Sequence, residues 1–145
     1  MLERARVKPA ARGRNIRFLM GDAERTMEAD GSYDVITNRH LVWTLVDPLA
    51  CFREWHRVLK PGGTFMGTML SARRVPVELA KASGREISRN TWVFDGPGDK
   101  VHPHYFCPAR DLVALFAGFE LVSLVDREHD TPGSWHWHVL AERVA

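Results

Sequence analysis

One segment, from Ser32 to Met66, restricts the fold of this 145-residue chain more than any other. It opens with a run at Tyr33 to Thr37 that is mostly β-branched or aromatic and follows a Gly-Ser turn signal, which predicts a strand buried on both faces. A second apolar run extends from Thr64 to Leu70. The two runs, with a helical pattern between them, predict a strand, helix, strand unit with a right-handed crossover and parallel strands.

The residues between the two runs predict an amphipathic helix. Asp47 can accept hydrogen bonds from the first helical turn, and Pro48 at the next position loses only a donor that has no partner there. At 100° per residue one side of the helix is apolar, as expected for a helix packed on a sheet. That side carries Cys51, Phe52, Trp55, Val58 and Leu59. We expect Pro61-Gly62-Gly63 to stop the helix.

Three polar residues, Asn38, Arg39 and His40, come directly after the first predicted strand. Ligands of open α/β sheets bind beyond the carboxyl ends of the strands, so these side chains are candidates for a binding crevice. An imidazole there is suited to general base catalysis, which makes His40 the candidate catalytic residue. Many methyl-transfer and other group-transfer sites work by positioning alone, so a structural role for His40 stays open.

The flanking segments extend the α/β pattern. Residues 2–12 predict a helix, and Asn15 to Met20 predict a strand that carries Gly21-Asp22 at its carboxyl end. Near the C-terminus, residues 109–117 predict a short helix closed by Gly118. The runs Phe119 to Val125 and Trp135 to Ala141 predict an antiparallel hairpin.

Taken together, GDAE, SYDVITNRHLVWTL and REWHRVLKPGG resemble the middle of a class I S-adenosylmethionine (SAM) dependent methyltransferase, of the bacterial group related to quinone-biosynthesis methyltransferases. The resemblance implies a Rossmann-like sheet in the order three, two, one, four, five, seven, six, mostly parallel and ending in an antiparallel C-terminal hairpin. It also implies that Asp22 accepts from the adenine amino group of SAM and that the Ala23 amide donates to the ring. Asn38 and Arg39 would add further cofactor contacts, and without the resemblance Gly-Asp is simple turn chemistry.

The glycine-rich loop of that family, and the acidic residue that holds the ribose, have no counterpart in these residues. We therefore expect residues 1–145 to form a single methyltransferase-like domain that is truncated at its N-terminus, with weak or absent SAM binding by this chain alone. The implied function is methyl transfer to a small molecule. The alternative is a non-catalytic remnant or interaction module of the same fold that binds no SAM.

Composition limits the partners. Twenty basic and eighteen acidic residues are interspersed and give a net charge of +2, which disfavours nucleic acid and membrane surfaces as partners. The two cysteines show no pairing motif, and no apolar run approaches twenty residues, so we expect a cytoplasmic protein. The family's strand order leaves the Tyr33 strand with an unpaired edge, and we expect the first strand or a second copy, as a homodimer, to pair with it.

Two features carry less specific signals. His102, His104, His136 and His138 can be drawn as a zinc site, but no carboxylate or cysteine has ligand spacing among them, so we expect structural histidines and no metal. Residues 71–100 show a short helical pattern near Pro76 and a Gly-rich loop at 95–99. Within them, Trp92 and Phe94 are candidate walls of a substrate pocket or simply core residues.

Overall fold

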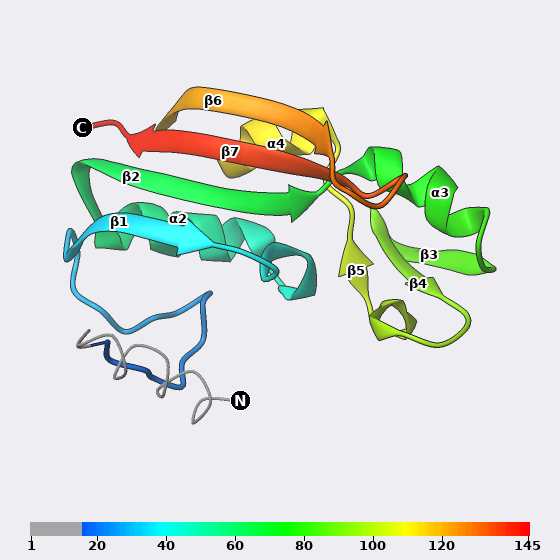
Figure 1. Cartoon of the computed structure of the whole chain (residues 1–145). Helices are drawn as coiled ribbons and strands as arrows, with labels where there is room; N and C mark the ends of the chain where they lie inside the picture. The colour runs from blue at the N-terminus through cyan, green and yellow to red at the C-terminus, as the bar shows by residue number, and fades with distance from the viewer. Residues whose placement is uncertain (1–15) are drawn as a thin grey trace.

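A computed structural model of the chain describes residues 16–145 and contains two sheets (Figure 1). The larger sheet has four strands in the order β1-β2-β7-β6. Their bounds are Tyr33–Asn38 for β1, Leu59–Leu70 for β2, Phe119–Glu128 for β6 and Trp135–Arg143 for β7. This order reproduces strands four, five, seven and six of the predicted arrangement, which confirms the α/β fold class.

The strand directions also agree with that prediction. β1 pairs with β2 in parallel, with Ile36 opposite Phe65, while β2 pairs with β7 and β7 with β6 in antiparallel registers. The predicted C-terminal hairpin is therefore confirmed, and both of its strands are longer than the sequence suggested. Among the described residues, β1 and β2 form the parallel part of this sheet.

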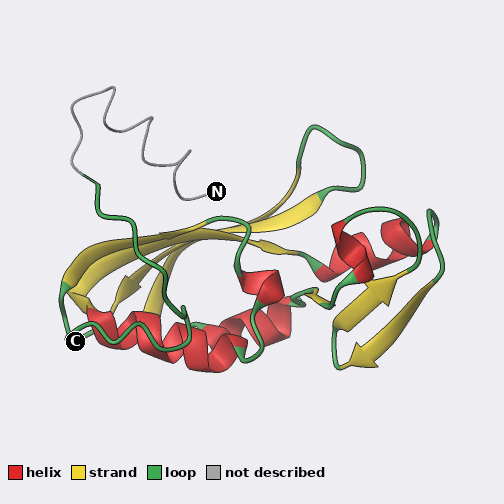
Figure 2. Cartoon of the chain, turned by 90° about the horizontal axis from the view of Figure 1, so that it is seen from below, coloured by secondary structure: helices red, strands yellow, loops and turns green. Residues whose placement is uncertain are grey.

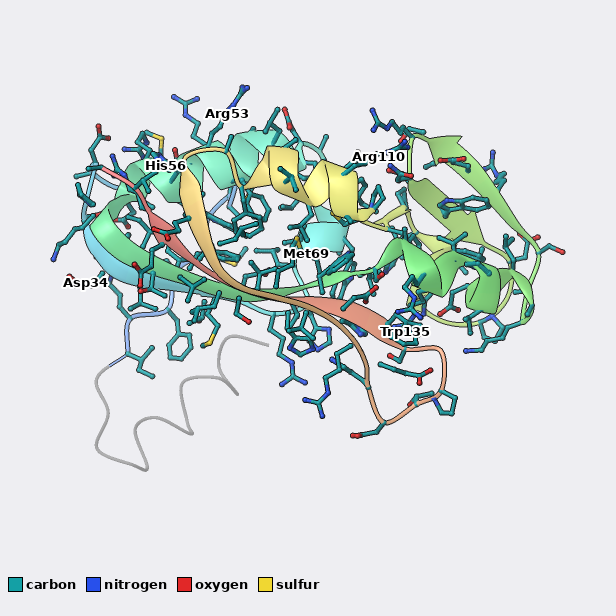
Figure 3. All side chains as sticks on the ribbon, turned by 90° about the horizontal axis from the view of Figure 1, so that it is seen from above. Asp34, Arg53, His56, Met69, Arg110 and Trp135 are labelled. Atoms are coloured by element: carbon teal, nitrogen blue, oxygen red, sulfur yellow. The ribbon has the colours of Figure 1, made fainter. Side chains whose placement is uncertain are left out.

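Two helices cover one face of the larger sheet (Figure 2). They are α2, Pro48–Val58, and α4, Ala109–Leu115. Asp47 caps α2 as predicted, because its carboxylate accepts from the Ala50 amide at 3.0 Å. Arg53 points away from the sheet, whereas Met69 lies buried between the sheet and the helices (Figure 3). The core beneath α2 is aromatic, with the Phe52 ring 5.6 Å from Phe65 and 4.9 Å from Phe116.

A smaller unit stands beside the main sheet (Figure 1). Its strands are β3, Gly84–Ser88, β4, Thr91–Phe94, and β5, His104–Tyr105, with α3 at Val75–Leu79. Three short 3-10 helices complete the structure at Val42–Thr44 (η1), Ala72–Arg74 (η2) and Asp99–Val101 (η3). Trp92 and Phe94 stack in the core of this unit, so Phe94 is a core residue rather than a pocket wall. No helix within residues 16–145 is long and apolar enough to cross a membrane.

Three local expectations were wrong. Residues 16–20 form no strand, because the described residues place no strand beside them to pair with. Pro61-Gly62-Gly63 lies inside β2 rather than between helix and strand, since α2 already ends at Val58. Val35 is 54% exposed, because α2 covers only one face of β1. The helix predicted at residues 2–12 lies outside the described residues.

The outer edge of β1 pairs with no other described strand, and we predict that a second copy of the chain pairs with it. The strand has an acidic start at Asp34, an apolar middle and Arg39 just past its end, so antiparallel self-pairing brings opposite charges together. Light scattering over a dilution series should show a dimer that Val35→Lys dissociates. A strict monomer whose amides at residues 35–37 exchange without protection would contradict this expectation.

A second prediction concerns acid stability. Glu54 accepts from Arg57 Nη2 at 2.7 Å and from the Thr26 amide at 2.9 Å, which ties the segment before β1 to α2. The Arg57 hydrogen bond, with help from Thr26, lowers the pKa of Glu54 from 4.5 to about 2. The stabilisation is therefore present above pH 4.5 and is lost as the pH falls toward 2.

We expect Glu54→Gln to lower the free energy of unfolding by about 1–3 kcal/mol at pH 7, the typical value for a hydrogen bond to a charged group. The difference from wild type should shrink between pH 4.5 and pH 2. Urea unfolding at several pH values measures both effects, with the exposed Glu120→Gln as control. A difference independent of pH would show that the carboxylate charge contributes nothing.

Candidate functional site

The loop after β1 combines a buried amide with a strained backbone. Asn38 is 7% exposed and donates from Nδ2 to the Thr68 carbonyl at 3.2 Å. Its Oδ1 is buried and has no hydrogen-bond partner among the described residues. His40 has a φ of +59°, a left-handed conformation that is uncommon for a residue other than glycine. An unsatisfied buried oxygen and a strained residue two positions apart are typical of a ligand site.

The side chain of His40 is held by two neighbours. Arg39 Nε donates to His40 Nε2 at 3.1 Å, so Nε2 carries the lone pair and Nδ1 carries the proton in the neutral ring. The imidazole also meets the edge of the Trp43 indole, with ring centroids 5.1 Å apart. Trp43 belongs to η1, which follows the loop directly and is buried. The backbone and these contacts together fix the orientation of a potential base.

His40 lies at a large open cleft of about 1290 Å³ between the main sheet's strand ends and the smaller sheet. One wall contains Trp43 and the start of α2, and the other contains Thr91 and Tyr105. Arg110 lies beside α4 on the side that faces the smaller sheet (Figure 3). The cleft has the size of a small-molecule site and a polar minority among apolar lining residues, which is the usual composition of such sites.

The GDAE motif is fastened to the start of α2. Asp22 accepts from the Glu24 amide at 2.9 Å, and the Ala23 carbonyl accepts from the Cys51 thiol at 3.2 Å. Glu24 Oε1 accepts from the amides of Val46 and Asp47, both at 2.8 Å. Sequence analysis missed this role of Glu24, because its partners lie more than twenty residues away and no local pattern signals them.

The predicted site residues face three different hollows. Asp22 and Ala23 line a hollow of about 400 Å³ beside β1. Asn38 and Arg39 line another of about 420 Å³ that also includes residues of β2 and β7. His40 alone of the five faces the large cleft. The described residues thus place these side chains around the end and edge of β1, without gathering them in one cavity.

Several buried groups are unsuited to proton transfer at neutral pH. Burial raises the pKa of the Cys107 thiol to about 12, and burial also raises the pKa values of Cys51 and Tyr105. Tyr105 in addition contacts Asp111, at 3.2 Å from its hydroxyl. Among residues 16–145 no group of three or more histidine, cysteine or acidic side chains has the geometry to hold a metal ion. His40 therefore stays the candidate base at the cleft.

Comparison with known proteins agrees with this geometry. The sequence model of a family described as "Methyltransferase domain" matches residues 1–67. A ubiquinone biosynthesis O-methyltransferase of Ruegeria pomeroyi is 37% identical over 139 residues, which is 93% of this chain and 53% of that protein. The chain belongs to the SAM-dependent methyltransferase family. The membership agrees with the strand order and with the polar loop at the end of β1.

Two further relatives define the extent of this methyltransferase likeness. A malonyl-[acyl-carrier protein] O-methyltransferase of a Marinomonas species is 30% identical over 107 residues, covering 74% of this chain and 35% of that protein. A crystal structure of a SAM-dependent methyltransferase from Methanosarcina mazei shares the fold, with a TM-score of 0.70 and 17% identity over 90% of this chain and 68% of that chain. The chain spans about half the length, or less, of these two curated relatives.

The protonation state of His136, in β7, provides a test of the site's electrostatics. Burial, reinforced by His129, Arg74 and His138, lowers the pKa of His136 to about 4, although its Nδ1 bond to the Ser134 carbonyl opposes the shift. We predict a neutral ring at pH 7 with the proton on Nδ1. Because the unfolded chain binds this proton near pH 6.5, the residue lowers stability as the pH falls from 6.5 to 4.

Nitrogen-15 spectra of the imidazoles, with His136→Gln to assign the signal, measure this state directly. The expected result is a midpoint near pH 4 and an Nδ1-protonated tautomer. A midpoint near 6.5, or a proton on Nε2, would contradict the buried environment described above.

Proposed function

We propose that this methyltransferase-family chain takes part in methyl transfer from SAM to an oxygen atom of a small molecule bound in the large cleft. The observation that supports the proposal most directly is the position of His40 at the carboxyl end of β1, beside that cleft. Two curated relatives are O-methyltransferases, which favours oxygen as the methyl acceptor.

The residues around β1 fit parts of SAM. The buried Asn38 Oδ1 lacks a protein partner and can accept from an ammonium group, as on the methionine moiety of SAM. Asp22 lies at a hollow beside β1, where a second carboxylate oxygen can accept from the adenine amino group, and Ala23 lies next to it. Arg39 would complete the set near the methionine carboxylate. SAM supplies an electrophilic methyl group on a positively charged sulfur.

His40 would act on the acceptor. The hydroxyl oxygen of the acceptor forms the new bond to the methyl carbon as the carbon–sulfur bond breaks, and the hydroxyl proton must leave. His40 Nε2 bears a lone pair that Arg39 Nε now occupies at 3.1 Å. Exchange of that bond for the acceptor hydroxyl lets Nε2 take the proton, while the Trp43 edge keeps the ring in place.

Binding of S-adenosylhomocysteine to the 145-residue chain tests the proposal. These residues contain no GxGxG loop, so we expect a dissociation constant above about 1 mM, equivalent to a binding free energy weaker than about −4 kcal/mol. NMR titration at millimolar ligand should shift the amides of Asp22, Ala23 and Asn38. Asp22→Asn keeps the turn to Glu24 but weakens the adenine contact, whereas Asp30→Asn should leave binding unchanged.

A chain that shows no shift at these amides at 10 mM ligand, on the order of tenfold above the expected constant, would sink the proposal. That result would favour the alternative of a non-catalytic interaction module with the same fold. A micromolar constant would instead show that the partial site is sufficient for SAM without a glycine loop.

A further inference from the structure

A second, smaller cavity of about 230 Å³ lies next to the large cleft. Its titratable lining residues are all basic: His40, Arg74, Lys100, His104, His129 and His136. The other lining residues are Trp43, Leu70 and Ser134, so the lining contains no acidic side chain. A cavity with only basic titratable groups complements an anion.

The two permanent cations of this cavity are held in place by one carboxylate. Glu78 in α3 is buried and accepts from Arg74 Nε at 2.6 Å, while Lys100 Nζ lies 3.7 Å from the same oxygen. Arg74 Nη1 also donates to the Ser134 hydroxyl at 3.1 Å. One acid balances one of the two cations, so the cavity keeps an excess positive charge even when every imidazole is neutral.

The imidazoles are rigidly placed as well. His104 and His136 are 4% and 5% exposed, and each ring uses Nδ1 to bond a backbone carbonyl two residues earlier, at 2.9 and 3.0 Å. Their centroids lie 6.4 and 6.3 Å from the Trp43 indole, one on a stacked and one on a tilted ring. His129 stacks on His136 with centroids 4.3 Å apart. Preorganised nitrogen groups of this kind reduce the entropy cost of binding a ligand.

The cavity also borders the proposed reaction site. His40, Trp43 and His104 line both the small cavity and the large cleft. We propose that the small cavity binds a carboxylate group of the methyl acceptor, which places the acceptor's hydroxyl-bearing part in the cleft beside His40. This inference rests on the proposed function and narrows its substrate class to carboxylate-bearing small molecules.

Paired ligands test the proposal without any need for methyl transfer. 4-Hydroxybenzoate carries the carboxylate, and 4-hydroxybenzamide is neutral with nearly the same shape. NMR titration of the wild-type chain should show the benzoate shifting the Trp43 indole and His136 signals with at least about tenfold higher affinity than the amide, the range of one charge-assisted hydrogen bond. Equal affinity of the two ligands, or shifts elsewhere only, would overturn the proposal.

A charge-removing variant locates the effect. Lys100→Gln should weaken benzoate binding about tenfold and leave the amide unchanged, while Lys60→Gln removes the same charge far from the cavity and should change neither. Thermal melts establish that both variants fold. Unaltered benzoate affinity in a folded Lys100→Gln chain would overturn the assignment to this cavity, and the wild-type comparison decides the matter if the variant does not fold.

S-Adenosylhomocysteine provides the third arm, because its methionine moiety also carries a carboxylate. If this ligand shifts the cavity signals and benzoate does not, the cavity serves the cofactor and the proposal is wrong. If benzoate binds there and S-adenosylhomocysteine binds nowhere, the anion site stands while the proposed methyl transfer fails. The two hypotheses are thus separated by one set of titrations.

Discussion

The structure depends on an aromatic core between α2, α4 and one face of the main sheet. Phe52, Trp55, Phe65 and Phe116 pack with centroid separations of 4.9–5.6 Å. Each such side chain contributes on the order of 1.5–3 kcal/mol through burial. The contacts join a helix, two strands' worth of sheet and the α4 connection into one unit, so every functional loop at the strand ends is anchored to this core.

The same packing leaves the main sheet unevenly covered. Helices lie on one face only within residues 16–145, and on the other face Met66 is 53% exposed (Figure 2). Together with the unpaired edge of β1, this bare apolar surface favours further association, since unpaired strand edges readily recruit another chain. The fold thus meets the requirements of a core while leaving an edge and a face available for contact.

Positive charge is concentrated where the two sheets meet. The chain as a whole is nearly neutral, with a net charge of +2, yet the small cavity beside His40 is lined by basic groups alone among its titratable residues. A local excess of this kind directs an anionic ligand without making the whole protein bind polyanions. The left-handed backbone at His40 turns the chain from β1 into η1 and so places Trp43 between the cleft and this cavity.

The sequence by itself determined the local elements: the parallel unit of β1, α2 and β2, the Asp47 cap and the C-terminal hairpin. These depend on hydrophobic periodicity and capping chemistry, which act between near neighbours. Only the tertiary structure decided that residues 16–20 form no strand, that Glu24 holds the start of α2, and that Arg74, Lys100 and His136 share one cavity. Such contacts join residues far apart in the chain, and their geometry follows from the packed sheet and helices rather than from any local pattern.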